Sequence, residues 1–143
     1  QGAHVAVYRP ADEPSAEDEP HPGCFSWHEL WTSDPEGAWD FYSDLFGWEK
    51  ADAMDMGEAG VYQMYRRPGG RDLGGIARLR PEMPVSAWLL YAMVPDAERA
   101  AKTVESEGGR IHQGPMEGPG GDMVAMGMDP QGAHFAVHAK AGA

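Results

Sequence analysis

The chain has 143 residues, of which 42% are apolar, and its formal net charge is −12 at pH 7. This length is enough to bury a core, and the acidic excess argues against binding to nucleic acid or to an anionic membrane surface. No apolar run is long enough to cross a bilayer. Cys24 is the single cysteine, which excludes an internal disulfide and predicts a reducing, cytoplasmic location.

The first 23 residues are predicted to lie outside the main domain. Residues 10–23 contain five acids and four prolines, a composition typical of a solvated linker. Residues 1–8 (QGAHVAVY) nearly repeat residues 131–138 (QGAHFAVH). Because the second copy is predicted to close a sheet, we expect residues 1–9 to be the closing strand of a preceding module. Such an orphan strand should pair with a sheet edge, in its own chain or in a second copy.

The first half of the main domain is predicted to contain a strand, a helix and three strands. Residues 24–32 are rich in aromatic and β-favouring side chains. Asp34 and Pro35 are typical of a helix start and Gly47 of a helix end. The helix spacing predicts one buried face, which consists of Ala38, Phe41, Tyr42 and Leu45. The strands expected next cover residues 48–53, 61–67 and 73–79.

The second half repeats this order. A strand is expected at residues 87–94, followed by a helix that begins after Asp96 and ends at Gly108-Gly109. Three further strands are expected at residues 110–114, 123–128 and 133–138. The sequence therefore predicts an α+β domain over residues 24–143, built of two βαβββ units at residues 24–80 and 85–140.

These patterns resemble the vicinal oxygen chelate superfamily, which includes glyoxalase I, the bleomycin resistance proteins and the extradiol dioxygenases. The resemblance covers roughly residues 24–140, and its strongest pieces are Asp34, Ala38, Phe41-Tyr42, Leu45-Phe46-Gly47-Trp48, Gly108-Gly109 and Asp129-Pro130-Gln131-Gly132-Ala133. It implies a cupped, mostly antiparallel eight-stranded sheet with helices on the outer face and a site on the concave face. The element order alone would also allow two ferredoxin-like halves without a cup.

The residues at the family's metal-ligand positions do not suit a metal. Counting from the shared motifs, these positions fall on Trp27, Ala77, Leu89 and Ala136, none of which ligates a divalent ion. We therefore expect no cofactor. A divalent metal would require His28, one position away, to be turned inward by a bulge. His134 and His138 are four strand steps apart, roughly 13 Å, which is too far to share one ion.

Aromatic side chains dominate the predicted site. Trp27, Trp31 and Trp88 or Tyr91 would line an apolar cup suited to a planar or cationic ligand; alternatively, these rings are simply core. Glu29 is the candidate catalytic residue, as a general base or hydrogen-bond acceptor, and its alternative is a structural carboxylate. Cys24 is interpreted as an inert, buried thiol.

The sequence thus predicts a module that binds a small organic molecule without a metal. The expected ligand-binding residues are Trp27, Glu29, Trp31, Trp88, His134 and His138. The alternatives are a metal-dependent lyase or dioxygenase of the same superfamily, or a non-catalytic scaffold half of a tandem protein. The expected partners are a small molecule and either a second copy or a preceding module.

Overall fold

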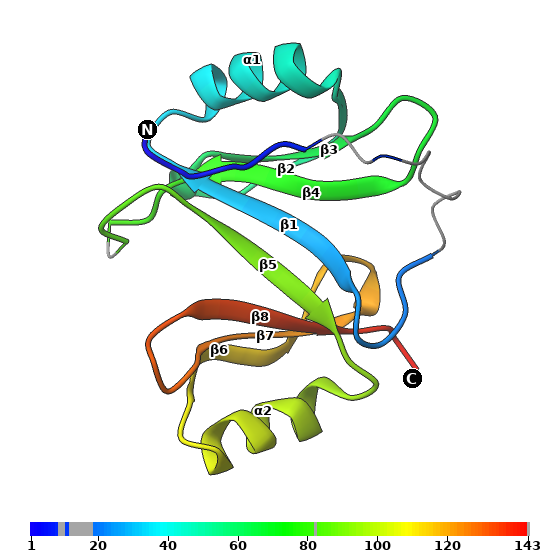
Figure 1. The fold of residues 1–143 in the computed structure, drawn as a ribbon, viewed down its shortest axis with the longest axis vertical. Coiled ribbons are helices and arrows are strands. Elements are labelled where there is room, and N and C mark those ends of the chain that lie inside the picture. Colours follow the sequence, from blue (N-terminus) through cyan, green and yellow to red (C-terminus); the bar gives the residue numbers. More distant parts are fainter. Residues whose placement is uncertain (9–10, 12–18, 82, 143) are drawn as a thin grey trace. The chain divides into compact units, whose positions relative to one another are not determined.

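The computed structural model describes residues 1–8, 11, 19–81 and 83–142. It is an α+β structure with two helices and eight strands in a mostly antiparallel sheet (Figure 1). Parallel pairing is seen between β1 (Phe25–Thr32) and β4 (Asp72–Arg78) and between β5 (Ala87–Met93) and β8 (His134–Ala139). Of the helices described, none has both the length and the apolar character needed to cross a membrane.

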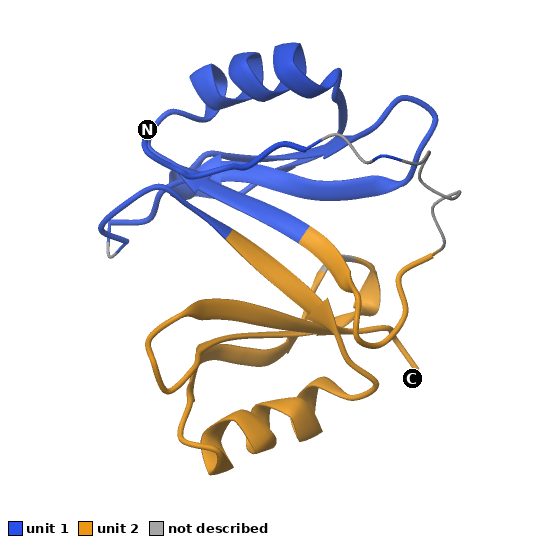
Figure 2. Cartoon of the chain, viewed as in Figure 1, with its two compact units in different colours: residues 1–18, 28–88 blue, residues 19–27, 89–143 orange. Residues whose placement is uncertain are grey.

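Two compact units divide the chain (Figure 2). Unit 1 comprises residues 1–18 and 28–88, and unit 2 comprises residues 19–27 and 89–143. Residues 23 and 24 join unit 2 because the amide of Gly23 donates to the carbonyl of Met93, and the amide of Met93 donates to the carbonyl of Cys24. The division cuts two strands, because residues 25–27 of β1 belong to unit 2 and residues 87–88 of β5 belong to unit 1, so the units differ from the sequence repeat in their bounds.

Unit 1 carries its strands in the order β2-β3-β4-β1, with α1 packed against one face (Figure 1). Its buried core consists of Leu30, Ala38, Tyr42, Tyr65 and Ile76. The elements are β1 (Phe25–Thr32), α1 (Pro35–Phe46), β2 (Glu49–Asp55), a short 3₁₀ turn (Gly57–Ala59), β3 (Val61–Arg66) and β4 (Asp72–Arg78).

Helix α1 begins and ends where the sequence predicts. The Asp34 side chain accepts from the amide of Gly37, and Gly47 ends the helix with a left-handed φ of 66°. The predicted buried face is wrong in part, because Phe41 is 56% exposed and Leu45 48% exposed. The other two members of the predicted face, Ala38 and Tyr42, are buried as expected, and the Tyr42 ring stacks on Phe46 and Trp48.

Unit 2 carries its strands in the order β5-β8-β7-β6, and α2 packs against one face. Small residues dominate its core, which consists of Ala97, Ala101, Ala125, Val137 and Ala139. The elements are β5 (Ala87–Met93), α2 (Ala97–Ser106), β6 (Arg110–Glu117), a short 3₁₀ turn (Pro119–Gly121), β7 (Met123–Met128) and β8 (His134–Ala139).

Strand β6 is longer than the sequence predicts. It pairs with β7 from Arg110 to Glu117, with register shifts between Ile111 and Gln113 and between Gln113 and Met116. These irregularities interrupt the alternation of side chains, so a pattern search ends the strand too early.

Residues 1–8 form no strand within this chain, and their expected pairing in a preceding module or with a second copy stays a prediction. The Gln1 amide donates to the Asp34 carboxylate at 3.2 Å, and Ala3 packs against the unit 1 core. Residue 9 and most of the predicted linker, residues 10 and 12–18, lie outside the described residues.

Candidate functional site

Glu29 is a buried carboxylate held between two aromatic donors in unit 1. The Trp31 indole N–H donates to Oε2 at 2.8 Å, and the Tyr62 hydroxyl donates to Oε1 at 2.8 Å. Glu29 and Trp31 are each only 5% exposed. Because Leu30 between them packs in the core with α1, strand alternation places both side chains on the opposite face. This trio is called the Glu29 cluster below.

Gly75 makes the Glu29 cluster possible. It pairs with Glu29 across β4 and β1, and the Tyr62 ring lies directly over it. A Cβ at position 75 would lie 2.1 Å from Cζ of Tyr62, which no structure tolerates without movement. Because Gly75 has no side chain, the Tyr62 ring can lie across it and its hydroxyl can reach the Glu29 carboxylate.

Gly74 has the same role on the α1 face. It pairs with His28, and a Cβ there would overlap the His28 carbonyl oxygen first and would lie 2.7 Å from the Tyr65 hydroxyl, which donates to that carbonyl at 3.2 Å. Burial, with smaller contributions from Tyr42 and Glu29, raises the pKa of Tyr65 well above its ordinary value. The hydroxyl therefore stays protonated and able to donate at neutral pH.

His28 lies on the same face as Leu30 by strand alternation, so its side chain is directed away from the Glu29 cluster. Burial and the nearby Arg71 charge lower the pKa of His28, against an opposing hydrogen bond with the backbone of Leu73. The imidazole is therefore neutral at pH 7. The inward turn that a metal at His28 would require is absent from β1, whose register with β4 is regular from His28 to Thr32.

Arg80 covers the Trp31 ring. Its guanidinium carbon lies 4.6 Å from the ring centroid, which is a cation–π geometry. The position over Trp31 that the sequence assigned to a cationic ligand is thus taken by a residue of the chain itself. A ligand that stacks on this face of the ring has to displace Arg80.

Trp88 lies apart from the Glu29 cluster. Its indole N–H donates to the Tyr42 hydroxyl at 3.3 Å, and its ring packs edge-on against Tyr42, Trp48 and Tyr65. The structure therefore places Trp88 in the aromatic core beneath α1, and does not group it with Trp31 as the sequence suggested. Trp27 is half-buried and belongs to unit 2.

Both ring nitrogens of His138 are engaged within unit 2. Nε2 donates to Oδ2 of Asp122 at 2.7 Å, and Nδ1 lies 2.8 Å from Oγ of Ser26. Asp122 also accepts from the amide of Ala141, and Ser26 donates to the carbonyl of Tyr91. Sequence spacing could not reveal this chain of groups, because Asp122, Ser26 and His138 come from three separate segments.

Two further contacts in unit 2 concern residues singled out from the sequence. His134 is exposed, and its ring faces that of His112 at 5.6 Å between centroids. Cys24 is half-buried rather than fully buried, and its sulfur lies 3.3 Å from Nε2 of His21. The sequence signal for that pair was the three-residue spacing of His21 and Cys24.

The described residues do not fit the family's metal site. Ala77 and Ala136, at two of the four ligand positions, are buried alanines, and the other two positions hold Trp27 and Leu89. Within residues 1–8, 11, 19–81 and 83–142, no three His, Cys, Asp or Glu side chains gather closely enough to hold an ion. We therefore derive no chemistry through a metal at these positions.

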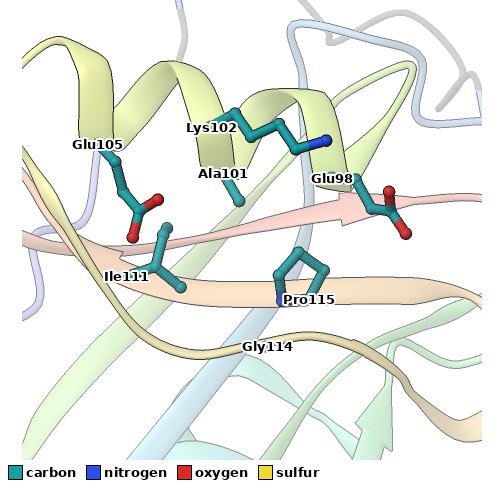
Figure 3. A pocket seen from close by; sticks show the side chains of 7 residues that line it. All are labelled: Glu98, Ala101, Lys102, Glu105, Ile111, Gly114 and Pro115. Carbon is teal, nitrogen blue, oxygen red and sulfur yellow. The ribbon is translucent and has the colours of Figure 1, made fainter.

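A surface hollow of about 320 Å³ lies between α2 and β6 (Figure 3). Its lining carries two carboxylates and one ammonium group and consists of Glu98, Ala101, Lys102, Glu105, Ile111, Gly114 and Pro115. None of the residues predicted to bind a ligand lines it, so it is separate from the Glu29 cluster.

The family follows from comparison with known proteins. Residues 24–137 match the model of the glyoxalase/bleomycin resistance protein/dioxygenase superfamily, and the chain belongs to it. It is 32% identical to the anthracycline biosynthesis protein DnrV of Streptomyces peucetius over 133 residues, which is 83% of this chain and 48% of DnrV. The chain thus spans about half the length of the curated relatives it matches.

Solved structures show the same fold. Methylmalonyl-CoA epimerase of Streptomyces coelicolor, in complex with 2-nitronate-propionyl-CoA, matches with a TM-score of 0.61 and 15% identity over 85% of this chain and 97% of the epimerase. The methylmalonyl-CoA epimerase of Mycobacterium tuberculosis matches with a TM-score of 0.61 and 14% identity, over 89% and 94% of the two chains. At such identities the likeness shows the fold alone.

Proposed function

We propose that this chain binds a planar small organic molecule at the Glu29 cluster, without a resident metal at the family's ligand positions. The observation that carries the proposal is the buried Glu29 carboxylate, aimed between Trp31 and Tyr62 on the face of unit 1 opposite α1. A buried carboxylate among aromatic rings is costly unless it is hydrogen-bonded, and such groups gather at functional sites. The proposal includes a cytoplasmic location, which the lone Cys24 supports.

The chemistry of the cluster suits recognition of a polar group on a flat ligand. Each Glu29 oxygen accepts one hydrogen bond from its aromatic partner, and these two bonds hold the carboxylate in a fixed orientation. Once Arg80 leaves the Trp31 ring, the indole offers a flat apolar surface beside that carboxylate. Glu29 then serves as hydrogen-bond acceptor or as general base for a proton on the ligand.

A binding experiment separates this proposal from an inert core. A panel of planar aromatic compounds, with and without amide or phenol N–H and O–H groups, is screened by saturation-transfer NMR. We expect hits that lose at least about tenfold in affinity on Glu29→Gln. Trp39→Phe is the matched control, because Trp39 lies on α1 beneath Lys50 and should leave binding unchanged. Hits that bind Glu29→Gln as tightly as the wild type would contradict the proposal.

The alternative, a metal-dependent lyase or dioxygenase, is tested by elemental analysis of the purified chain. We expect the protein as purified, after dialysis against metal-free buffer, to carry well under one equivalent of zinc, nickel, manganese or iron. A near-stoichiometric metal that is lost on His28→Ala would overturn the metal-free proposal and favour the alternative.

We also propose that the chain functions as one module of a tandem protein, in which residues 1–9 close a preceding module. The support is the match of residues 1–8 to residues 131–138, and the matched relatives are about twice as long as this chain. A chain extended upstream by one such module should place residues 1–8 in a strand with slow amide exchange. Fast exchange throughout these residues in the extended chain would contradict it. Two alternatives to this arrangement are a homodimer, in which residues 1–9 pair with a second copy, and a tandem protein in which this chain is a non-catalytic scaffold half.

A further inference from the structure

Two exposed imidazole rings face one another on unit 2. His112 lies in β6 and His134 begins β8, and their ring centroids are 5.6 Å apart with the planes inclined by 31°. Both residues are exposed, and neither ring makes a hydrogen bond to the described part of the chain. This pair lies away from the α2–β6 hollow, whose lining includes neither histidine.

The order of the strands and the register shift in β6 explain why the two histidine rings lie close together. β7 separates β6 from β8, so their backbones are about 10 Å apart. The register of β6 shifts between Ile111 and Gln113, which places an irregularity at His112, and such bulges re-aim a side chain. Phe135 packs on the α2 side, so His134 lies on the opposite face of the regular strand β8, and the ring contact places His112 on that face as well.

We propose that His112 and His134 form a binding site for a late divalent transition-metal ion, with water completing the coordination. Imidazole nitrogen binds such ions at about 2.1 Å, which places each ring centre roughly 3 Å from the metal. Two rings on one ion then have centres roughly 4.5 to 6.5 Å apart, depending on the angle between them. The observed 5.6 Å lies within this range.

The site is distinct from the family's metal positions. Those positions fall on Trp27, Ala77, Leu89 and Ala136, none of which takes part here. With two protein ligands and an exposed setting, the ion exchanges with solvent and keeps open positions. By the general order of affinities, Cu²⁺ binds most tightly, ahead of Ni²⁺ and Zn²⁺.

Calorimetric titration of the full chain with Ni²⁺ tests the proposal. We expect one ion per chain, with at least about tenfold weaker binding after His112→Ala and after His134→Ala. Mutating even a residue that only hydrogen-bonds to a metal ligand typically lowers the metal affinity by that factor. Both side chains are exposed, so the variants should keep the wild-type circular dichroism. NMR signals near His112 and His134 should broaden first, because Ni²⁺ is paramagnetic.

Two exposed histidines elsewhere serve as matched controls. His4→Ala should leave the affinity unchanged, and so should His21→Ala, whose ring lies beside the Cys24 sulfur and is the strongest competing site. Binding that survives both His112→Ala and His134→Ala would overturn the proposal. So would binding that is lost with His21→Ala while the two proposed ligands are intact.

Discussion

At the scale of single residues, the two consecutive glycines of β4 decide where two tyrosine rings lie. Tyr62 crosses Gly75 on one face to reach Glu29, and Tyr65 crosses Gly74 on the other to reach the His28 carbonyl. Each hydroxyl thus reaches the residue of β1 that pairs with the glycine it covers. The glycines act here through the absence of a side chain.

A methyl group at position 75 should therefore disturb the Glu29 cluster. We expect Gly75→Ala to lower the free energy of unfolding by about 1–3 kcal/mol, as overpacking of a filled site does. Urea denaturation measures this, and Gly118→Ala is the matched control because its nearest atom would be at an ordinary 3.5 Å. Adding Tyr62→Val should relieve the clash, giving a double variant less destabilised than the sum. Strict additivity would contradict this explanation.

The hydrogen bonds of Asp122 give the protein a defined acid dependence. Burial acts to raise the pKa of Asp122, but the hydrogen bonds from His138 and from the Ala141 amide outweigh it, and the pKa is lowered. A carboxyl with a lowered pKa in the folded state stabilises the fold above its unfolded pKa, near 3.8. That contribution is lost as the pH falls through the lower, folded value.

The measurement is the urea midpoint between pH 7 and pH 3. Asp122→Asn should reduce the fall of the urea midpoint at acid pH. The control variant Asp52→Asn, at an exposed position, should leave the pH profile of the midpoint unchanged. Equal profiles for the wild type and Asp122→Asn would show that the bond to His138 contributes nothing.

At the scale of elements, the sequence predicts where α1 lies but only part of its buried face. Asp34, Pro35 and Gly47 mark its ends through local backbone chemistry, which needs no knowledge of the partner. The 3.6-residue period also fits several overlapping apolar stripes, because Ala38, Trp39, Phe41, Tyr42 and Leu45 are all apolar or aromatic. The choice among them is made by Trp48, which stacks on the inward-facing Tyr42 ring and also on Tyr65.

Alanine substitutions of the adjacent residues Phe41 and Tyr42 test which face of α1 is buried. Tyr42→Ala is expected to cost about 3–5 kcal/mol as a loss of a buried ring, whereas Phe41→Ala should cost well under half of that. Thermal and urea denaturation compare the two variants directly. A larger loss for Phe41→Ala would mean that α1 faces the core with the stripe the sequence first suggests.

At the scale of the whole molecule, the element order could be predicted because capping residues and turns are local signals. The bounds of the two compact units could not, since residues 23 and 24 are placed by backbone hydrogen bonds to Met93, far along the chain. The candidate site shows the same limit. Alternation grouped Glu29 with Trp31, but only the fold shows that Tyr62 completes the cluster and that Trp88 packs with Tyr42.

The most direct test of ligand binding at the Glu29 cluster is the indole N–H signal of Trp31 in a ¹H–¹⁵N NMR spectrum, assigned with Trp31→Phe. This proton donates to Glu29, so a ligand that engages the carboxylate or displaces Arg80 changes its surroundings. We predict that compounds that bind shift this signal more than that of Trp39, which lies on α1. Binding that leaves the Trp31 signal unmoved would contradict the account.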